Sequence, residues 1–381
     1  MRVLWLLVLA GAMLVGLAAE GLAAPAAKSA TPAAPPAAAQ TAASPAATPA
    51  APPQYLVPRV PKQLTLCGAA VPLELPLVAE QLDRELVISV HDPARVIMWL
   101  KRAGRYFPYI SQRLKEAGLP QDLKYLAVAE SSLIHYIRSV AGAVGPWQFM
   151  AATGRRYGLR VDHWFDDRRS LPKSTQAALA YLKDLQKEFG SWPLAMAAYN
   201  CGEKRVRQEL KEQAVKDYFN LALPNETQRY VYRILAVKII LSDPKRFGFD
   251  MPPDSLWRPL PSEKASLELK RPLHLTVLAQ AAGTTFRGLK ELNPELRERH
   301  LPRGKHQIMV PPGQAAGLAA RLGKAGPGPR PAGEVYVVQR GDNLSGIALR
   351  HGISLKDLRQ ANRLSRDRLL QPGERLIIPE K

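Results

Sequence analysis

The chain has 381 residues, of which 34 are proline, and a formal net charge of +20. This length exceeds one simple core, so we expect two or three folded units, and the composition excludes a wholly disordered protein. The positive charge favours anionic surroundings such as nucleic acid, lipid head groups or an acidic wall polymer, although a solvated basic surface would carry the same charge.

The N-terminal segment has the pattern of an export signal. Arg2 precedes an apolar run from Val3 to Ala19, and a small-residue cleavage site follows at Ala24. An uncleaved anchor is the alternative, but the run is short against the ~20 residues of a spanning helix. We therefore expect a signal peptide over 1–24, export to the periplasm or cell envelope, and an Ala/Pro-rich linker over 25–60.

Cysteine and histidine usage gives two further expectations. No cysteine precedes Cys67, so we expect no lipid attachment after the signal. Cys67 and Cys201 reach an oxidising compartment under this hypothesis, and the sequence is compatible with one disulfide or with two free thiols. No Cys/His cluster has the spacing of metal ligands, so no metal site is expected.

Residues 61–255 are predicted to form one all-α domain. Their apolar residues follow the helical period, with almost no alternating pattern. One clear helix is expected to begin with a cap at Ser174 and to end at Gly190, and a later one to begin near "PNET" with Asn225 as its cap. Pro108 is expected to break a helix into two.

An internal repeat follows this domain. Residues 275–296 align with 344–365 at a constant offset, and each copy continues to a glycine, an apolar run and a proline. We therefore expect two similar small modules, 265–313 and 334–381, joined by a linker over 314–333. In the second module, two strands flank two short helices, which predicts a small α+β unit of βααβ order.

Glu130 is a lone acid in an apolar run, the only residue between Lys124 and His135 that is ordinarily charged at neutral pH. The helical period places it on a buried face, where an ionised carboxylate is unfavourable and the pKa should rise. A carboxylic acid still protonated near neutral pH can protonate a leaving group. A buried glutamate paired with an arginine is the structural alternative. The other residues of this face are Leu123, Leu126, Ala127, Leu133 and Ile134.

Two segments after Glu130 have residues suited to sugars. "AGAVGPWQF" is a glycine-rich loop in which an exposed Trp147 would stack on a sugar ring and Gln148 would bond hydroxyl or acetamido groups. A tryptophan that fills the core is the alternative. "AAYNCGE" places Tyr199 and Asn200 at a helix end, where they face a cleft or only cap the helix.

Together, "AESS", "AGAVGPWQFM", "AAYNCGE" and "ETQRYV" resemble, in order and spacing, the motifs of the soluble lytic transglycosylase family, which has the goose-type lysozyme fold. "YVVQRGDNLSGIALRHGISLKDLRQANRL", continuing to "LQPGERLIIP", resembles a full LysM module. Residues 275–312 resemble a degenerate LysM that lacks the opening strand. The resemblance covers about 90–250 and 270–380. It implies a mainly α protein in which a lysozyme-like catalytic domain, with its motif core at 110–235, precedes peptidoglycan-binding LysM modules.

By this resemblance the chain is a lytic murein transglycosylase, a carbon–oxygen lyase acting on the MurNAc-β-1,4-GlcNAc bond of peptidoglycan. Glu130 would protonate the bridging oxygen and then, as a carboxylate, accept the proton of the muramic C6 hydroxyl, which leaves a 1,6-anhydro end. The implied substrate-binding residues are Ser131, Trp147, Gln148, Tyr199, Asn200 and Tyr230, the last lying near Glu130. Gly341, Asp342, Asn343 and Leu344 are the expected glycan-binding loop of the second LysM module, or a turn that only shapes it.

Two residues depart from the family pattern, because Pro146 replaces the usual leucine and Cys201 the usual alanine. A water-using muramidase is one alternative function, with Asp162, Asp166 and Asp167 as candidates for the second carboxylate, although these residues sit in a polar turn with nearby arginines. A non-catalytic LysM wall-binding protein is another. We expect no cofactor and no nucleic-acid partner. The expected partner is peptidoglycan glycan, bound by a monomer with weak attraction to anionic membrane or wall polymers.

Overall fold

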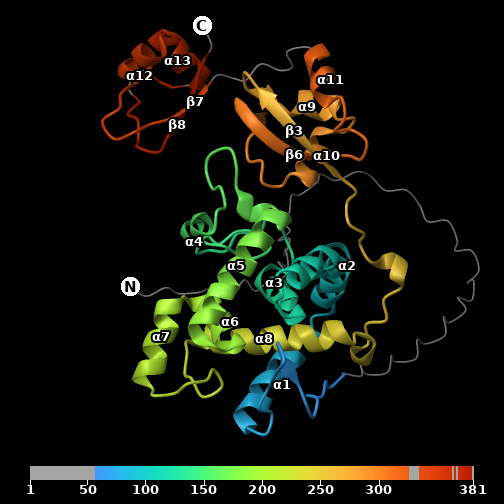
Figure 1. Cartoon of the computed structure of the whole chain (residues 1–381). Helices are drawn as coiled ribbons and strands as arrows, with labels where there is room; N and C mark the ends of the chain where they lie inside the picture. Colours follow the sequence, from blue (N-terminus) through green and yellow to red (C-terminus); the bar gives the residue numbers. More distant parts are fainter. Residues whose placement is uncertain (1–55, 326–333, 363, 366–367, 380–381) are drawn as a thin grey trace, which may run out of the picture. The chain divides into compact units, whose positions relative to one another are not determined.

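The computed structural model describes residues 56–325, 334–362, 364–365 and 368–379. The expected signal peptide and nearly all of the expected 25–60 linker lie outside the described residues. Within them, three hydrophobic cores are present, one in the helical region and one in each of the modules that follow (Figure 1). No helix of the described part combines the length and apolar character needed to cross a bilayer.

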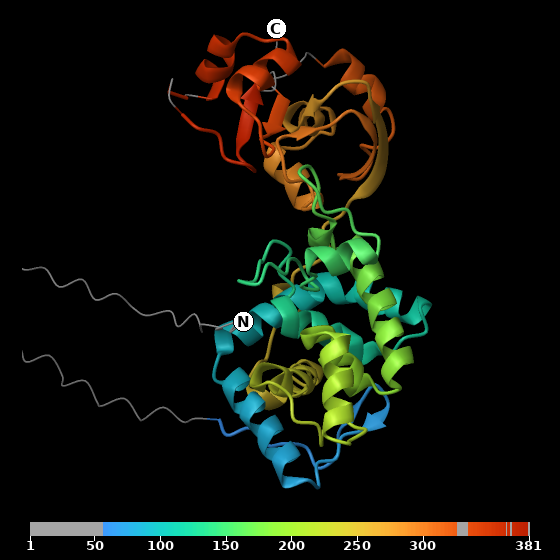
Figure 2. The same ribbon diagram turned by 90° about the vertical axis from the view of Figure 1, so that its left-hand side faces the viewer.

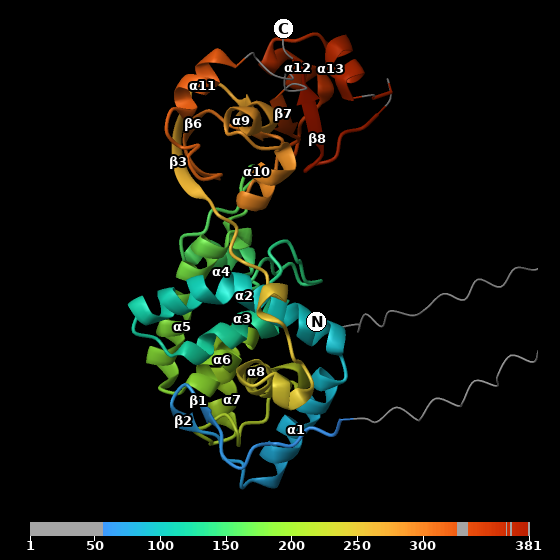
Figure 3. The same cartoon turned by 90° about the vertical axis from the view of Figure 1, so that its right-hand side faces the viewer.

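The first core belongs to a helical domain, as the sequence predicted. Figure 2 shows its helices, coloured light blue to yellow, gathered into one bundle. The helices are α1 (Pro76–Val90), α2 (Pro93–Glu116), α3 (Lys124–Ser131), α4 (Ala151–Arg156), α5 (Leu171–Phe189), α6 (Trp192–Cys201), α7 (Glu203–Glu212) and α8 (Asn225–Ser242). A short hairpin of β1 (Thr65–Leu66) and β2 (Ala69–Ala70), labelled in Figure 3, precedes α1 in sequence, and Lys238 of α8 donates to its Thr65 carbonyl at 2.6 Å. Single 3₁₀ turns occupy Gln121–Leu123, Asp167–Arg169, Lys245–Phe247 and Pro253–Ser255.

Helix α8 is the centre of this domain. It contacts α1, α3 and α6, and α3 in turn contacts α2. Its sequence is apolar on almost all sides, which is typical of a helix surrounded by others. Its buried residues are Thr227, Tyr230, Val231, Tyr232, Ile234, Leu235, Ala236, Val237, Ile239 and Ile240. This burial fixes the position of every side chain that α8 presents to its neighbours.

The helix starts differ from the predictions. α5 begins at Leu171, because Pro172 is well suited to a first turn, and Ser174 therefore lies inside the helix. The buried Ser174 hydroxyl donates to the Ser170 carbonyl at 2.6 Å. α8 includes Asn225 as its first residue, with no side-chain cap. Gly190 does end α5, in the left-handed conformation that glycine adopts without strain.

The prediction that Pro108 breaks a helix is wrong. α2 runs unbroken from Pro93 to Glu116 with Pro108 inside it. Both halves of α2 bury side chains in the same core, among them Trp99 before the proline and Ile110 and Leu114 after it. Burial of each such side chain contributes about 1.5–3 kcal/mol, and together they exceed the ~3 kcal/mol that a proline costs in a helix.

The two modules have the same order of elements, which confirms the repeat. In the first, β3 (Glu263–Leu269) pairs antiparallel with β6 (Gly304–Val310), and α9 (Leu275–Ala281) and α10 (Phe286–Leu292) lie between them in sequence. A small second ladder joins β4 (Leu273–His274) to β5 (His300–Leu301). In the second, β7 (Glu334–Val337) pairs antiparallel with β8 (Arg375–Ile378), with α12 (Leu344–His351) and α13 (Leu355–Asn362) between them.

Two expectations for the first module are wrong. It does have an opening strand, β3, in which buried Ala265 and Leu267 alternate with exposed residues. The segment 314–333 is not entirely linker, because α11 (Leu318–Lys324) lies in it and Leu318 is part of the module's core. One buried leucine in a sequence of glycine, alanine and proline is too weak a periodic signal to predict this helix.

Equivalent asparagines fasten each module. The Asn293 side chain donates to the carbonyls of Leu289 and Met309 at 2.8 and 2.7 Å, and accepts from the Met309 amide at 2.7 Å. Asn362 makes the same three bonds to Leu358 and Ile377. Each asparagine therefore joins the end of the second helix to the closing strand.

We predict that Asn293→Ala destabilises the first module and Asn362→Ala the second. Each change leaves backbone groups of the closing strand without partners, which costs about 2 kcal/mol or more. Hydrogen exchange at β6 and at β8 measures the two effects separately. Each variant should raise exchange in its own module and leave the other module as in wild type. If either variant raised exchange equally in both modules, the equivalent roles of Asn293 and Asn362 would be contradicted.

Candidate active site

Glu130 lies at the end of α3, which stops one residue later. Ser132 and Leu133 both have left-handed backbones, with φ of 52° and 62°. The expectation that the helical face continues through Leu133 and Ile134 is therefore wrong. Two such residues in succession are unfavourable and need support from their surroundings. Trp99 Nε1 donates to the Ser132 hydroxyl at 2.8 Å and supplies part of it.

Glu130 is half-buried as a whole, and its carboxyl group is enclosed enough for burial to be the largest effect on its pKa. Tyr230 of α8 lies beside it, as the motif implied, and donates a hydrogen bond to Oε1. Burial raises the pKa of Glu130 to about 7, against the opposing effects of the Tyr230 hydrogen bond and Arg233, and the exposed Glu226 adds to the rise. Among the described residues no arginine forms an ion pair with Glu130. The structure therefore does not support the alternative of a structural Glu–Arg pair.

Two tyrosines enclose this carboxyl group. Tyr230 is 1% exposed, and the Tyr199 hydroxyl donates to the Trp147 carbonyl at 2.6 Å. Burial, and then the nearby charge of Glu130, raise the pKa of both phenols well above their usual range. Both hydroxyls therefore stay protonated and remain donors at any physiological pH.

Ser131 fastens the glycine-rich loop to α3. Its side chain is buried, and its hydroxyl donates to the Pro146 carbonyl at 2.8 Å and to the Ala127 carbonyl at 3.2 Å. These contacts place the hydroxyl away from solvent. Ser131 therefore supports the loop, and a direct role in substrate binding is not favoured.

The departure at Pro146 has a structural explanation. The Gln148 amide donates to the Gly145 carbonyl at 3.1 Å, which closes a four-residue turn with Pro146 in its second position. Proline is favoured there because its ring fixes the backbone angle that such a turn needs. The bridge between Val144 and Phe149 frames the turn on either side.

The prediction of an exposed Trp147 is wrong. Its ring is fully buried in the core of the domain, and its Nε1 donates to the Thr175 hydroxyl at 2.9 Å. No face of the indole is open to a sugar, so the core-filling alternative holds. The carbonyl of Trp147, bonded by Tyr199, still takes part in fixing the loop.

Gln148 and Asn200 each have a side-chain polar atom that remains available to bond a ligand. Gln148 Nε2 donates to the carbonyls of Gly145 and Ile137 at 2.8 and 3.4 Å, and its Oε1 accepts no hydrogen bond from the described residues. Asn200 Oδ1 accepts from the Thr227 hydroxyl at 2.9 Å, which orients the Asn200 amide. Both side chains are half-buried, as expected for the edge of a site.

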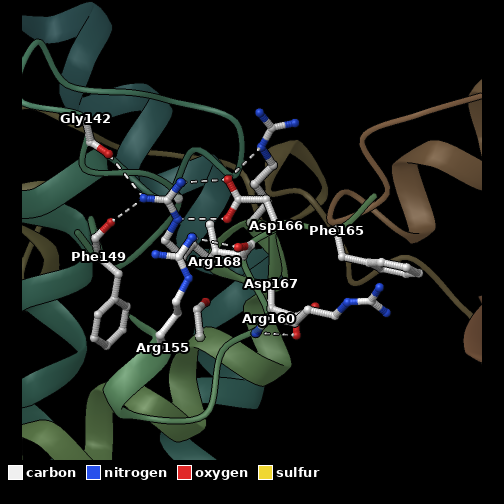
Figure 4. Close-up of polar contacts among 12 residues, drawn as sticks. Gly142, Phe149, Arg155, Arg160, Phe165, Asp166, Asp167 and Arg168 are labelled. Carbon is white, nitrogen blue, oxygen red and sulfur yellow. Dashed lines mark hydrogen bonds and ion pairs between the residues drawn. The ribbon is translucent and has the colours of Figure 1, made fainter. Parts of the chain in front are cut away.

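The three aspartates considered as a second carboxylate already have hydrogen-bond or ion-pair partners in the structure. Asp162 accepts from the amides of Trp164 and Phe165, Asp166 forms a bidentate pair with Arg168, and Asp167 pairs with Lys173 (Figure 4 draws the Asp166–Arg168 pair). They cap or pair, as their polar turn suggested. The acid whose negative charge acts on Glu130 is Glu226. Glu226 opens the motif "ETQRYV", but it was not among the site residues predicted from the sequence.

The remaining predicted sites give mixed outcomes. Cys67 and Cys201 are free and half-buried, so the possible disulfide is not formed. Cys67 sits in the tight β1–β2 turn with φ of 53°, and Cys201 ends α6. Among the described residues no group of His, Cys, Asp and Glu side chains could hold a metal ion.

The expected glycan-binding loop of the second module serves its fold. Asp342 accepts from the Tyr336 hydroxyl and the Gln339 amide, and these bonds, with Arg350, lower its pKa to about 2. Asn343 caps α12, and Leu344 is buried in the module's core. Gly341 has the positive φ that the turn requires. Glycan binding by this loop therefore remains a proposal, and for the Leu344 side chain it is not favoured.

Comparison with known families agrees with this architecture. A model described as "Transglycosylase SLT domain" matches residues 108–222. "Lytic transglycosylase MltD, LysM-like domain" matches 265–325, which includes α11, and "LysM domain" matches 336–379.

Individual proteins are also similar. Membrane-bound lytic murein transglycosylase D from two Escherichia coli strains, K12 and O6:H1, is 36% identical over 294 residues. The match covers 73% of this chain and 64% of those proteins, so this chain spans less than two thirds of their length. A putative tributyltin chloride resistance protein of Alteromonas sp. strain M-1 is 31% identical over 155 residues, 39% of this chain and 75% of that protein.

Among solved structures, the 70 kDa soluble lytic transglycosylase of Escherichia coli aligns at 23% identity with a TM-score of 0.30, over 39% of this chain and 26% of that one. A likeness at this level is too weak to support a conclusion. The family matches show that the chain contains a transglycosylase SLT domain followed by two LysM-type modules.

Proposed function

We propose that this protein is a peptidoglycan lytic transglycosylase that cleaves the MurNAc-β-1,4-GlcNAc bond and leaves 1,6-anhydro ends. The observation that carries this proposal is the enclosed carboxyl group of Glu130, bonded by Tyr230, whose pKa of about 7 leaves both of its protonation states accessible. The name of the Escherichia coli relatives, lytic murein transglycosylase, supports the same activity.

The reaction needs an acid and then a base, and one carboxyl group can be both. Glu130 in its protonated form donates to the bridging oxygen, and the bond to the muramic anomeric carbon breaks. The resulting carboxylate is stabilised by the Tyr230 hydrogen bond and accepts the proton of the muramic C6 hydroxyl, whose oxygen attacks the anomeric carbon. The proton returns to Glu130 and no water is consumed. Because the attacking hydroxyl belongs to the same sugar, it needs no second carboxylate to position it.

Substrate binding would use the half-buried side-chain amides of Gln148 and Asn200 together with the two LysM modules. Gln148 Oε1 can accept from a sugar hydroxyl or acetamido N–H, and the Asn200 amide can donate to a sugar oxygen. The LysM modules would hold the chain on the same polymer, which raises the local concentration of glycan at the site. Export to the periplasm or cell envelope remains the proposal that suits this substrate.

One observation favours a second candidate, a water-using muramidase. Exposed Glu226 is close enough to Glu130 to raise its pKa, and a second carboxylate near the first is what a hydrolase requires. The two reactions differ in their products, since an anhydro end is lighter than a reducing end by one water.

The first test is product analysis by mass spectrometry after digestion of purified sacculi. Wild type should release anhydro ends, and Glu130→Gln should lose activity by about 10²–10⁴-fold because the proton donor is gone. The matched control is Glu226→Gln, which should keep anhydro products and most of its rate. Reducing ends from wild type would establish the muramidase, and undiminished digestion by Glu130→Gln would show that Glu130 is not the catalytic acid. Absence of digestion by wild type would leave only a wall-binding protein.

The second test is the pH dependence of kcat/KM. In wild type the rate should fall as pH rises through about 7, because Glu130 loses the proton it must donate. Tyr230→Phe removes the hydrogen bond that favours the charged form, so the pKa of Glu130 rises and the midpoint moves to higher pH. A midpoint that stays in place, or moves down, would show that Tyr230 does not act on Glu130.

The third test is stability against pH. Burial raises the folded-state pKa of Glu130 above its unfolded value, so folding takes up a proton between about pH 4.5 and pH 7, and the charged group destabilises the fold increasingly as pH rises through that window. Glu130→Gln should therefore stabilise the domain by about 3 kcal/mol at pH 8 and by much less at pH 5. Denaturant unfolding at the two values measures this difference. For the exposed control Glu226→Gln, the change in the free energy of unfolding should be the same at pH 5 and at pH 8.

A further inference from the structure

We infer that Arg168 is a positioning residue for the proposed reaction: its guanidinium holds both ends of the loop 142–149 and so keeps Gln148 at the sugar-binding edge. This inference rests on the proposed function for the identity of the substrate, and on the geometry below for the role of the arginine. The segment that carries Arg168 is the 3₁₀ turn Asp167–Arg169, directly before α5.

The Arg168 guanidinium is buried and fully engaged. The residue is 6% exposed, and its Nε and Nη2 donate to the two carboxylate oxygens of Asp166, each at 2.8 Å. Its third nitrogen, Nη1, donates to the carbonyls of Gly142 and Phe149 at 3.2 and 3.0 Å (Figure 4). One planar group therefore connects an aspartate fixed in the same turn with the first and last residues of the loop.

The middle of the loop rests on the backbone of the same arginine. Gly145 has φ of +87°, and a Cβ atom built on it would lie 1.9 Å from the Arg168 carbonyl oxygen. Only glycine fits at this distance. The loop is therefore in contact with Arg168 at its two ends and at its central turn.

This support matters because Gln148 has an unfavourable backbone. Its φ is 47°, in the left-handed region that residues other than glycine seldom occupy. Such a conformation persists only where the surroundings impose it. Ser131 and Tyr199 hold the Pro146 and Trp147 carbonyls from one side, and Arg168 holds Gly142 and Phe149 from the other.

Stability alone does not explain a buried ion pair at this place. Removing both charges from water is unfavourable, and an apolar pair of similar volume is often as stable. An apolar pair, however, cannot donate to two loop carbonyls. Lysine cannot replace the arginine either, because an ammonium lacks the planar fork that bonds the carboxylate and both carbonyls at once.

The experiment uses the full chain with Arg168→Lys, and with Gly145→Ala as a second variant that keeps the Arg168 side chain but forces the loop away from the Arg168 carbonyl. Both should raise KM for soluble glycan strands by about tenfold to 100-fold, with a smaller change in kcat. Hydrogen exchange should rise at the amides of residues 144–149 and stay unchanged in α5 and α8. The pH midpoint of Glu130 should also stay as in wild type. The matched control is Arg155→Lys, because Arg155 also donates to a backbone carbonyl, that of Val161, outside the loop.

Three outcomes overturn the inference: an unchanged KM in both variants, hydrogen exchange that rises throughout the domain together with KM, or an equal rise of KM in Arg155→Lys. The second outcome would mean that Arg168 only stabilises the fold. Failure of the proposed function is seen separately, because it requires Glu130→Gln to keep its activity or wild type to give reducing ends.

Discussion

The hydrogen bond from Tyr230 to Glu130 is the interaction on which the proposed site depends. It joins the C-terminal end of α3 to α8, whose side chains form much of the core, so the phenol cannot move without unpacking that core. It also opposes the effect of burial. Burial favours the neutral acid and the phenol favours the carboxylate, and the balance places the pKa of Glu130 at about 7. A group that must give a proton and then take one back needs this balance, because a carboxyl group held strongly in either form would perform only one of the two steps.

The loop beside Glu130 is held in a way that its own sequence cannot provide. Its glycines offer little side-chain packing, and besides the buried Trp147 ring its fixed points are backbone carbonyls. Three residues from different parts of the chain donate to them: Ser131 from α3, Tyr199 from α6 and Arg168 from the turn before α5. The domain therefore buries a hydroxyl, a phenol and a guanidinium around one loop. Buried polar groups of this kind contribute little net stability, and their presence together is typical of a site whose geometry has been selected.

Local pattern was sufficient for the parts of the fold that depend on one helix or one repeat. The apolar stripe of α5, the βααβ order of the second module and the lone acid Glu130 were all predicted from the sequence. Predictions that depended on packing between distant segments were wrong: Pro108 stays inside α2, Trp147 fills the core, and β3 opens the first module. Arg168 had no signal at all, because nothing in a sequence separates an arginine that bonds loop carbonyls from one of the many that face solvent.

The net charge of +20 should favour ionisation of Glu130, yet this carboxyl group stays partly protonated at pH 7. The arginines nearest the site are paired with other acids. Glu85 of α1 is 2% exposed and accepts from Arg229 Nε at 2.6 Å, and its second oxygen lies 3.9 Å from Arg233 Nε. Arg233 is the arginine whose charge lowers the pKa of Glu130. Because the buried Glu85 carboxylate of α1 offsets that charge, burial remains the larger effect at Glu130, and the acid form survives in a strongly basic protein.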